Sequence, residues 1–292
     1  MLQNLFIFFC ALALVVKGAT VATKYGAKLA HGLGLSRYTI GFMVVAVISI
    51  LPETFVAINS SIAGMPSFGL GTLLGSNVAD MTLVFTVILL LAGRGIKVES
   101  KILQKNKLYP FLLLLPLIFG WDGYFSRTEG LALVVFGAIF YYTAFKNGSQ
   151  TNAHKDHDDN TRRSIFLFLL GMAVLIIGSH FTVVSATAFA SWLNINPILV
   201  GMLLVGLGTT MPELFFAFKA VKNRSDDLAI GDILGTVLAD ATVVVGILAL
   251  INPFAFPPKI IYVTGVFMVL SSALLFLCMR SGRVLSKKEG IL

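Results

Sequence analysis

The sequence has few charged residues and very little cysteine. Only 12% of its 292 residues are charged, against 57% that are hydrophobic, so the polar surface of a water-soluble domain is missing. Two cysteines, Cys10 and Cys278, lie in apolar stretches, which excludes a disulfide framework or a thiolate metal site and predicts that they serve as packing residues. The sequence also lacks an HExxH motif, which excludes that class of metalloprotease.

The net charge of +8 does not indicate a nucleic-acid-binding protein. Its basic residues are scattered over short connections instead of forming one patch. We therefore expect no nucleic-acid partner, and a lipid bilayer as the surroundings of the chain.

Apolar segments recur along the whole chain and predict an all-α, polytopic membrane protein. Helices of about 20 residues span the roughly 30 Å of a bilayer's hydrocarbon core. We predict nine such segments, at residues 3–30, 38–62, 67–92, 108–121, 127–145, 164–192, 197–221, 228–251 and 259–280.

One stretch of about 50 residues is present twice, at 41–90 and at 201–250. An offset of 160 positions superimposes the two copies, and the matched pairs are Pro52 and Pro212, Glu53 and Glu213, Gly71 and Gly231, Gly75 and Gly235, Asp80 and Asp240, and Thr82 and Thr242. The repeat predicts two halves, 1–145 and 164–292, joined by a polar linker at 146–163.

The distribution of Lys and Arg predicts the orientation in the membrane. Nineteen of the 22 lie in the odd-numbered connections and only Arg127 and Lys259 in the even ones, which predicts a cell-membrane protein with its N-terminus outside and linker 146–163 in the cytoplasm. Five segments separate equivalent points of the copies, so the halves are predicted to have inverted topology, an arrangement that places a shared site near the bilayer midplane.

The first apolar segment and the last seven residues each allow a specific prediction. No Lys or Arg precedes the first apolar run, so we interpret it as a mature helix instead of a signal peptide. The segment SKKEGIL at 286–292 is similar to SRTEGLA at the start of the fifth predicted helix, which suggests a ten-helix design whose tenth helix is truncated in this chain.

Four acidic residues are predicted to lie at mid-depth in the repeated hairpins: Glu53, Asp80, Glu213 and Asp240. Burying an unpaired charge there costs about 2.5–3.5 kcal/mol on insertion scales, and no basic residue in these helices lies at the same depth. These acids therefore either carry protons or face cations.

The surroundings of these acids favour a hard cation. A proline directly before each glutamate disfavours regular helix and should free carbonyls near Ser49 and Thr209. Side chains that can add oxygen ligands follow at Ser76, Asn77 and Thr236, and neither His nor Cys is among them. Because all-oxygen ligation suits calcium, magnesium or sodium, calcium is the first choice.

The motifs SILPE (49–53), GTLLGSNVAD (71–80), GTTMPE (208–213) and GDILGTVLAD (231–240) resemble those of the cation/calcium exchanger superfamily, most closely its prokaryotic sodium/calcium exchangers. The resemblance implies calcium held by Glu53 and Glu213 with the carbonyls of Ser49 and Thr209. It also implies sodium bound with help from the hydroxyls of Thr210, Ser76 and Thr236. It further implies that helices 3–30 and 164–192 slide over a fixed core.

This chain departs from the family pattern at several positions. Ile50 stands where a hydroxyl matching Thr210 is expected, and Thr72 and Asp232 replace the usual Asn after glycine. Acids at both Asp80 and Asp240 supply more negative charge than one calcium ion neutralises, so a proton or a second cation is expected there.

The sequence thus predicts a secondary-active antiporter that exchanges calcium for sodium by alternating access, without a cofactor, and that functions as a monomer. A proton/calcium antiporter of the same fold is the alternative. A passive channel and an intramembrane aspartyl protease are more remote, and the protease interpretation lacks the Gly-x-Gly-Asp signature.

Overall fold

The computed structural model describes residues 2–31, 46–97, 109–147, 161–282 and 284–285 of the chain. These residues are almost entirely helical, which confirms the predicted all-α, polytopic architecture. The predicted linker and the segment 286–292, on which the tenth-helix expectation rests, lie outside the described residues, apart from the edges of the linker.

Each of the nine predicted segments contains helix. The first half comprises α1 (Leu2–His31), α3 (Ala46–Ser49), α4 (Leu51–Ile62), α5 (Pro66–Ala79), η2 (Asp80–Val84), α6 (Phe85–Leu91), α8 (Tyr109–Phe119), η3 (Gly120–Asp122) and α9 (Arg127–Asn147). The second half comprises α10 (Thr161–Trp192), α11 (Pro197–Val200), η4 (Gly201–Val205), α12 (Gly206–Thr209), α13 (Met211–Lys222), α14 (Asp226–Ala239), η5 (Asp240–Val244), α15 (Val245–Ile251) and α16 (Pro258–Gly282).

Five helical runs in the described chain are long and apolar enough to cross a membrane: Gln3–Gly26, Pro66–Leu91, Thr161–Trp192, Pro197–Lys222 and Leu228–Ile251. Two shorter apolar helices, Tyr109–Asp122 and Pro258–Leu274, accompany them. Three of these runs, Pro66–Leu91, Pro197–Lys222 and Leu228–Ile251, are composite, because a π-helical turn joins their α-helical parts. Pro66 opens the first of them at a position where a missing N–H is tolerated.

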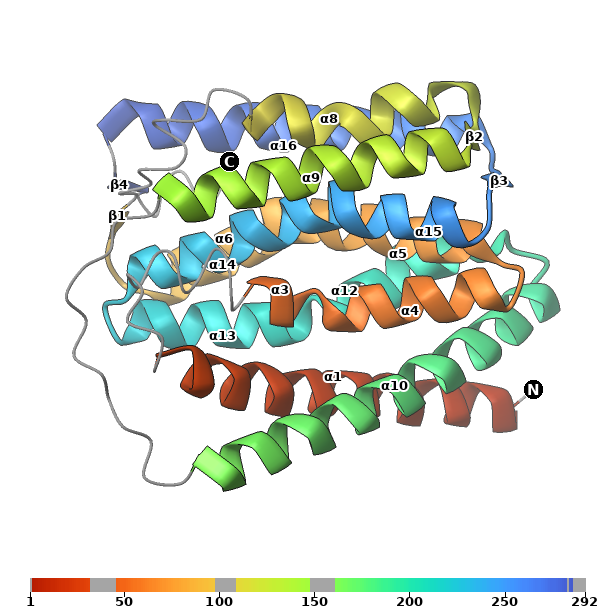
Figure 1. The fold of residues 1–292 in the computed structure, drawn as a ribbon, viewed down its shortest axis with the longest axis horizontal. Coiled ribbons are helices and arrows are strands. Elements are labelled where there is room, and N and C mark those ends of the chain that lie inside the picture. Colours follow the sequence, from red (N-terminus) through yellow and green to blue (C-terminus); the bar gives the residue numbers. More distant parts are fainter. Residues whose placement is uncertain (1, 32–45, 98–108, 148–160, 283, 286–292) are drawn as a thin grey trace.

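The helices form layers that run roughly parallel to one another (Figure 1). Helices α1 and α10 pack together along one edge, and α8, α9 and α16 lie along the opposite edge. The two repeated hairpins, α3–α6 and α11–α15, lie between these edges. Figure 1 also shows the α4–α5 turn and the α13–α14 turn at opposite ends of the bundle.

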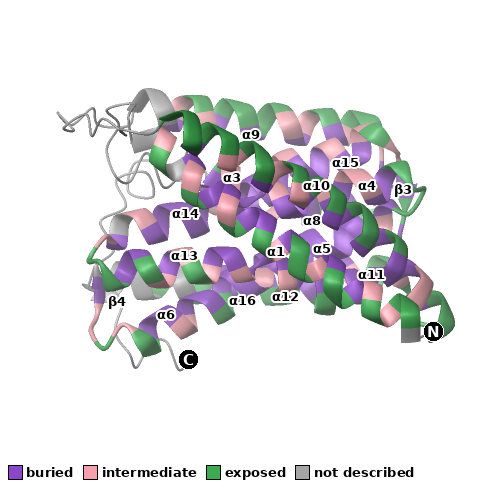
Figure 2. Ribbon diagram, turned by 90° about the horizontal axis from the view of Figure 1, so that it is seen from below, coloured by how far each residue is buried: buried purple, intermediate pink, exposed green. Residues whose placement is uncertain are grey.

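Burial follows the same layering. Figure 2 shows mostly buried residues in α5 and α14, and many exposed residues along α9 and α10. Many of the exposed side chains of α10 are large and apolar, as expected of a surface in contact with lipid, and include Phe166, Leu169, Ile177 and Phe181. Cys10, in α1, is also exposed, so the prediction that it serves as a packing residue is wrong.

Glycines allow the central helices to approach closely. A Cβ atom on Gly71 would lie 2.1 Å from the carbonyl oxygen of Ile198, and one on Gly75 would lie 2.2 Å from that of Met202. The same occurs between the edge helices, where a Cβ on Gly18 would lie 2.8 Å from the Gly171 carbonyl oxygen. Backbone-to-backbone packing of this kind is typical of membrane helices, which lack a hydrophobic drive to associate.

Two short antiparallel ribbons link the halves. Strand β1 (Ile96–Lys97) pairs with β4 (Val284–Leu285), and β2 (Tyr124–Phe125) pairs with β3 (Phe254–Ala255). Each ribbon therefore takes one strand from each half, and β2 and β4 stand 160 positions apart, as the repeat requires.

Candidate cation-binding site

Both glutamates of the repeat lie in the first turn of a helix that follows a break. Ile50 separates α3 from α4, and Thr210 separates α12 from α13. The hydrogen bonds described across the first break run from Ile50 N–H to the Ala46 carbonyl and from Thr54 N–H to the Ile50 carbonyl, and the second break has the equivalent pair. The carbonyls of Ser49 and Thr209 are not acceptors in these bonds, and Pro52 and Pro212 have no N–H to offer.

The two glutamate side chains are fully buried without hydrogen-bond partners. Glu53 is 1% exposed and Glu213 is 0% exposed, and all four carboxyl oxygens lack a partner among the described residues. The Thr209 hydroxyl lies near the Glu53 carboxyl group. It donates its own hydrogen bond to the Gly206 carbonyl, however, at 3.1 Å. Orphaned buried carboxyl groups of this kind require a proton or a cation.

Each aspartate of the repeat opens a π-helical turn. Asp80 is the first residue of η2 and Asp240 is the first residue of η5, and both side chains are buried. A π-helical turn contains an additional residue in an otherwise α-helical run, and such turns are frequent at functional sites. Nothing in the sequence pattern predicted these turns.

Two hydrogen bonds join the halves within this region. Ser49 Oγ donates to Asp232 Oδ1 at 3.0 Å, and Ser76 Oγ is 3.3 Å from Asp240 Oδ2. Asp240 Oδ1 and both carboxyl oxygens of Asp80 have no hydrogen-bond partner among the described residues. The structure thus brings predicted ligands of one half against acidic residues of the other.

The remaining predicted ligands are also buried. The side-chain nitrogen and oxygen of Asn77 and the hydroxyl of Thr236 lack partners in the described chain, whereas the Thr210 hydroxyl donates to the Gly206 carbonyl at 2.8 Å. All ten side chains predicted from the sequence are 1% exposed or less: Ser49, Glu53, Ser76, Asn77, Asp80, Thr209, Thr210, Glu213, Thr236 and Asp240.

Asp232 is a candidate site residue that the sequence motifs did not predict. Asp232 is fully buried in α14, with one carboxyl oxygen bound by Ser49 and the other without a partner. The available signal was its position one residue after a repeated glycine, where an acid replaces the expected Asn.

We call the five buried acids Glu53, Asp80, Glu213, Asp232 and Asp240 the acid cluster. These acids are close enough for their charges to interact. Asp80 is within electrostatic range of Glu53 and Asp232, and Glu213 is within range of the same two residues and of Asp80. No Lys, Arg or His among the described residues forms an ion pair with any of them. As arranged here, no three acidic, His or Cys side chains in the described chain could hold one metal ion, so hydroxyls and carbonyls would have to complete a coordination shell.

Comparison with known proteins identifies the family. A profile of the sodium/calcium exchanger protein family matches residues 3–146 and 163–292, which is nearly the whole chain. The chain belongs to the sodium/calcium exchanger family. This result confirms the resemblance seen in the repeated motifs.

Several relatives of this exchanger-family chain cover most of its length. The sodium/calcium exchanger MaX1 of Methanosarcina acetivorans is 25% identical over 332 aligned positions, covering 99% of this chain and 94% of the relative. The inner membrane protein YrbG of Escherichia coli is 28% identical over 264 positions, covering 85% and 79%. A putative antiporter, CaxA of Alkalimonas amylolytica, is 28% identical over 247 positions, covering 78% and 75%.

Solved structures of the sodium-calcium exchanger NCX_Mj share the fold. One, soaked with sodium and strontium, has a TM-score of 0.72 at 25% identity and covers 99% of this chain and 94% of that one. Another, soaked with sodium and calcium, also has a TM-score of 0.72, at 24% identity and 100% and 95% coverage. This exchanger-family chain is therefore a multi-pass membrane transporter and not an enzyme, which sets the protease alternative aside. The comparisons give no support to protons as a transported ion.

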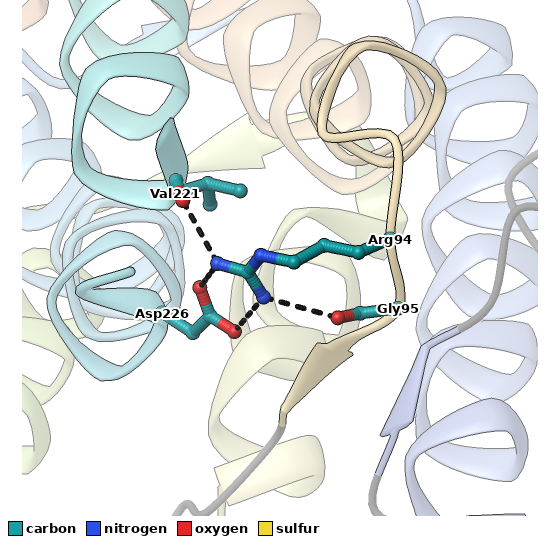
Figure 3. A network of polar contacts seen from close by, with 4 residues as sticks. All are labelled: Arg94, Gly95, Val221 and Asp226. Carbon is teal, nitrogen blue, oxygen red and sulfur yellow. Dashed lines mark hydrogen bonds and ion pairs between the residues drawn. The ribbon is translucent and has the colours of Figure 1, made fainter. Parts of the chain in front are cut away.

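One ion pair of this exchanger-family chain lies apart from the acid cluster (Figure 3). Arg94, after α6, donates to both carboxyl oxygens of Asp226 at 2.7 Å and 2.6 Å, and also to the carbonyls of Gly95 and Val221. The hydrogen bonds that Arg94 donates to Asp226 raise the pKa of Arg94. The guanidinium thus fastens the α13–α14 turn to the end of the first hairpin.

Proposed function

We propose that this protein exchanges calcium for sodium across the membrane by alternating access, at one site shared between two inverted halves. The observation that carries the proposal is the pair of buried, unpartnered glutamates, Glu53 and Glu213, each placed directly after a proline-associated break. Oxygen ligands without nitrogen or sulfur suit both calcium and sodium.

The proposed site takes calcium between Glu53 and Glu213, with the carbonyls of Ser49 and Thr209 as further ligands. Sodium is bound with help from the hydroxyls of Thr210, Ser76 and Thr236. The burial of these groups and the open hydrogen-bonding capacity of Glu53, Glu213 and Thr236 support this assignment. Asn77 and the two aspartates, Asp80 and Asp240, supply additional oxygens.

Inverted topology is supported by the positions of the hairpin turns, which lie at opposite ends of the bundle (Figure 1). Halves of this kind pool their ligands near the membrane midplane. The proposal places the N-terminus outside and the linker between the halves in the cytoplasm, with the bias of Lys and Arg as its basis.

The coupling of calcium transport to sodium transport follows from the negative charge of the site. Enclosing several carboxylates without cations in a region of low dielectric is costly, so only an ion-loaded site permits the change of access. The moving part is proposed to be the helix pair α1 and α10, which pack closely on each other. Helix α1 also contacts α3 and α12, the helices that end at the two breaks.

Transport into proteoliposomes tests the proposal. Purified protein is reconstituted, and radioactive calcium uptake is measured under an outward sodium gradient, under a proton gradient, and under neither. We expect uptake with the sodium gradient and none in Glu53→Gln or Glu213→Gln. Asp122→Asn, which alters an exposed carboxyl group outside the site, serves as the matched control. Uptake driven by the proton gradient alone would show that protons, and not sodium, are the coupling ion. Normal transport in both Gln variants would show that Glu53 and Glu213 do not form the site.

A further inference from the structure

Asp232 makes the two halves of the site unequal. In α14 it is fully buried, and its Oδ2 has no hydrogen-bond partner among the described residues. The equivalent position in the first half is Thr72, whose hydroxyl is satisfied by the Phe68 carbonyl at 3.2 Å. One half therefore presents an unsatisfied carboxyl oxygen where the other presents a satisfied hydroxyl.

The contact with Ser49 places Asp232 beside the first helix break. Ser49 Oγ is 3.0 Å from Asp232 Oδ1, and the next residue along the chain is Ile50. Ile50 is apolar, whereas Thr210 at the second break carries a hydroxyl. The additional carboxyl group thus contacts the residue next to Ile50, at the break that has no hydroxyl equivalent to that of Thr210.

Hydrogen bonding among the described residues satisfies only one oxygen of the Asp232 carboxyl group. Whether or not it carries a proton, its second oxygen has no partner in the described chain, and no basic side chain there pairs with it. Asp80 and Glu213 both lie within range of its charge.

We propose that Asp232 is a cation ligand of this protein, acting where Ile50 leaves the first break without a hydroxyl, and that its charge favours calcium over sodium there. This inference rests on the proposed function, because it assigns a further ligand to the same site. The ion that Asp232 would bind is a hard divalent cation.

The selectivity follows from Coulomb's law. The attraction of a carboxylate for a cation is proportional to the charge of the cation, so calcium gains about twice the energy that sodium gains at the same position. Affinity depends exponentially on binding energy. A substitution that removes the carboxylate charge and lowers calcium affinity about tenfold should therefore lower sodium affinity only about threefold.

Equilibrium binding of radioactive calcium to the purified full-length protein tests the inference, with sodium affinity measured by competition. In Asp232→Asn we expect calcium affinity to fall about tenfold and sodium affinity to fall about threefold. Thr72→Ser, which keeps the hydroxyl at the equivalent position, should bind both ions within twofold of the unaltered protein. Size-exclusion elution and thermal unfolding confirm folding, and Asp232→Thr provides the same readout if the Asn variant does not fold.

Two results would overturn the inference while leaving the proposed function intact. One is unchanged calcium affinity in the Asp232 variants while Glu53→Gln abolishes binding. The other is an equal loss of calcium and sodium affinity, which would show that the residue supports the fold without selecting between the ions. If Glu53→Gln instead binds calcium normally, the proposed function itself fails, and the assignment of Asp232 fails with it.

Discussion

The hydroxyl of Ser76 and the carboxyl group of Asp240 join the two halves of the protein through a 3.3 Å hydrogen bond. The serine lies in α5 and the aspartate begins η5, so the bond connects the two repeated hairpins. A bond of this kind within the proposed site links ion binding to the fit between the halves.

Removing this hydroxyl should affect sodium more than calcium. In Ser76→Ala, the loss of one sodium oxygen and of the bond to Asp240 should raise the sodium concentration for half-maximal exchange about 2- to 10-fold, since a neutral hydrogen bond contributes about 0.5–1.5 kcal/mol. Calcium affinity should stay within about twofold. Ser271→Ala, which removes a hydroxyl bonded to its own helix in α16, is the control. A larger loss for calcium than for sodium would contradict the assignment of Ser76.

The Arg94–Asp226 pair should stabilise the fold. Its two short hydrogen bonds require the fork of a guanidinium, but the Arg94 side chain is 33% exposed, which weakens the pair through solvent screening. We expect Arg94→Ala to lower the free energy of unfolding by about 1–2 kcal/mol and Arg94→Lys to recover only part of it. Thermal unfolding of the purified protein measures this effect. Lys222→Ala, an exposed charge at the same end of α13, should have little effect, and equal shifts in both variants would refute the prediction.

The close approach of α5 to the second hairpin should not tolerate a methyl group. Gly75→Ala places a Cβ 2.2 Å from the Met202 carbonyl oxygen, a backbone atom that cannot move aside without displacing its helix. Overpacking of this severity costs about 1–3 kcal/mol or more, so the variant should unfold at lower temperature or fail to purify as a single species. Gly265→Ala, whose new atom would lie 3.4 Å from the end of the Leu117 side chain, should behave normally.

A methyl group between α1 and α10 should slow transport without weakening ion binding, if these helices move together. Gly18→Ala would place a Cβ 2.8 Å from the Gly171 carbonyl oxygen and 2.8 Å from the Leu175 nitrogen. The altered packing lies outside the acid cluster, so calcium affinity should stay within about twofold while the exchange rate falls several-fold. Equilibrium binding and initial uptake rates separate the two effects. A loss of affinity with an unchanged rate would contradict this role of the helix pair.

The sequence predicted the large-scale organisation well because the bilayer imposes a strong pattern. Long apolar runs have few alternatives to helix, and the 160-residue repeat aligned Glu53 with Glu213 and Asp80 with Asp240 without any coordinates. Pro52 and Pro212 similarly indicated where the helices break, because proline lacks the donor that a regular helix needs there.

Other features depend on tertiary contacts and could not be predicted from one sequence. The π-helical turns at Asp80 and Asp240 differ from an α-helix by one residue and leave no periodic signal. Asp232 was noticed only as a departure from a motif, because its contact with Ser49 connects positions 183 residues apart. The exposure of Cys10 depends on which face of α1 meets α10, which an apolar run does not specify.

Each half is incomplete by itself, because both two-stranded ribbons take one strand from each half. A polypeptide ending at residue 145 would contain β1 and β2 without β4 and β3, and would carry Glu53 and Asp80 without Glu213 and Asp240. A polypeptide beginning at residue 164 would have the complementary deficiency. Neither fragment should therefore form a working unit, whereas the two produced together from separate genes have the strand pairings and opposing acids with which to reassemble.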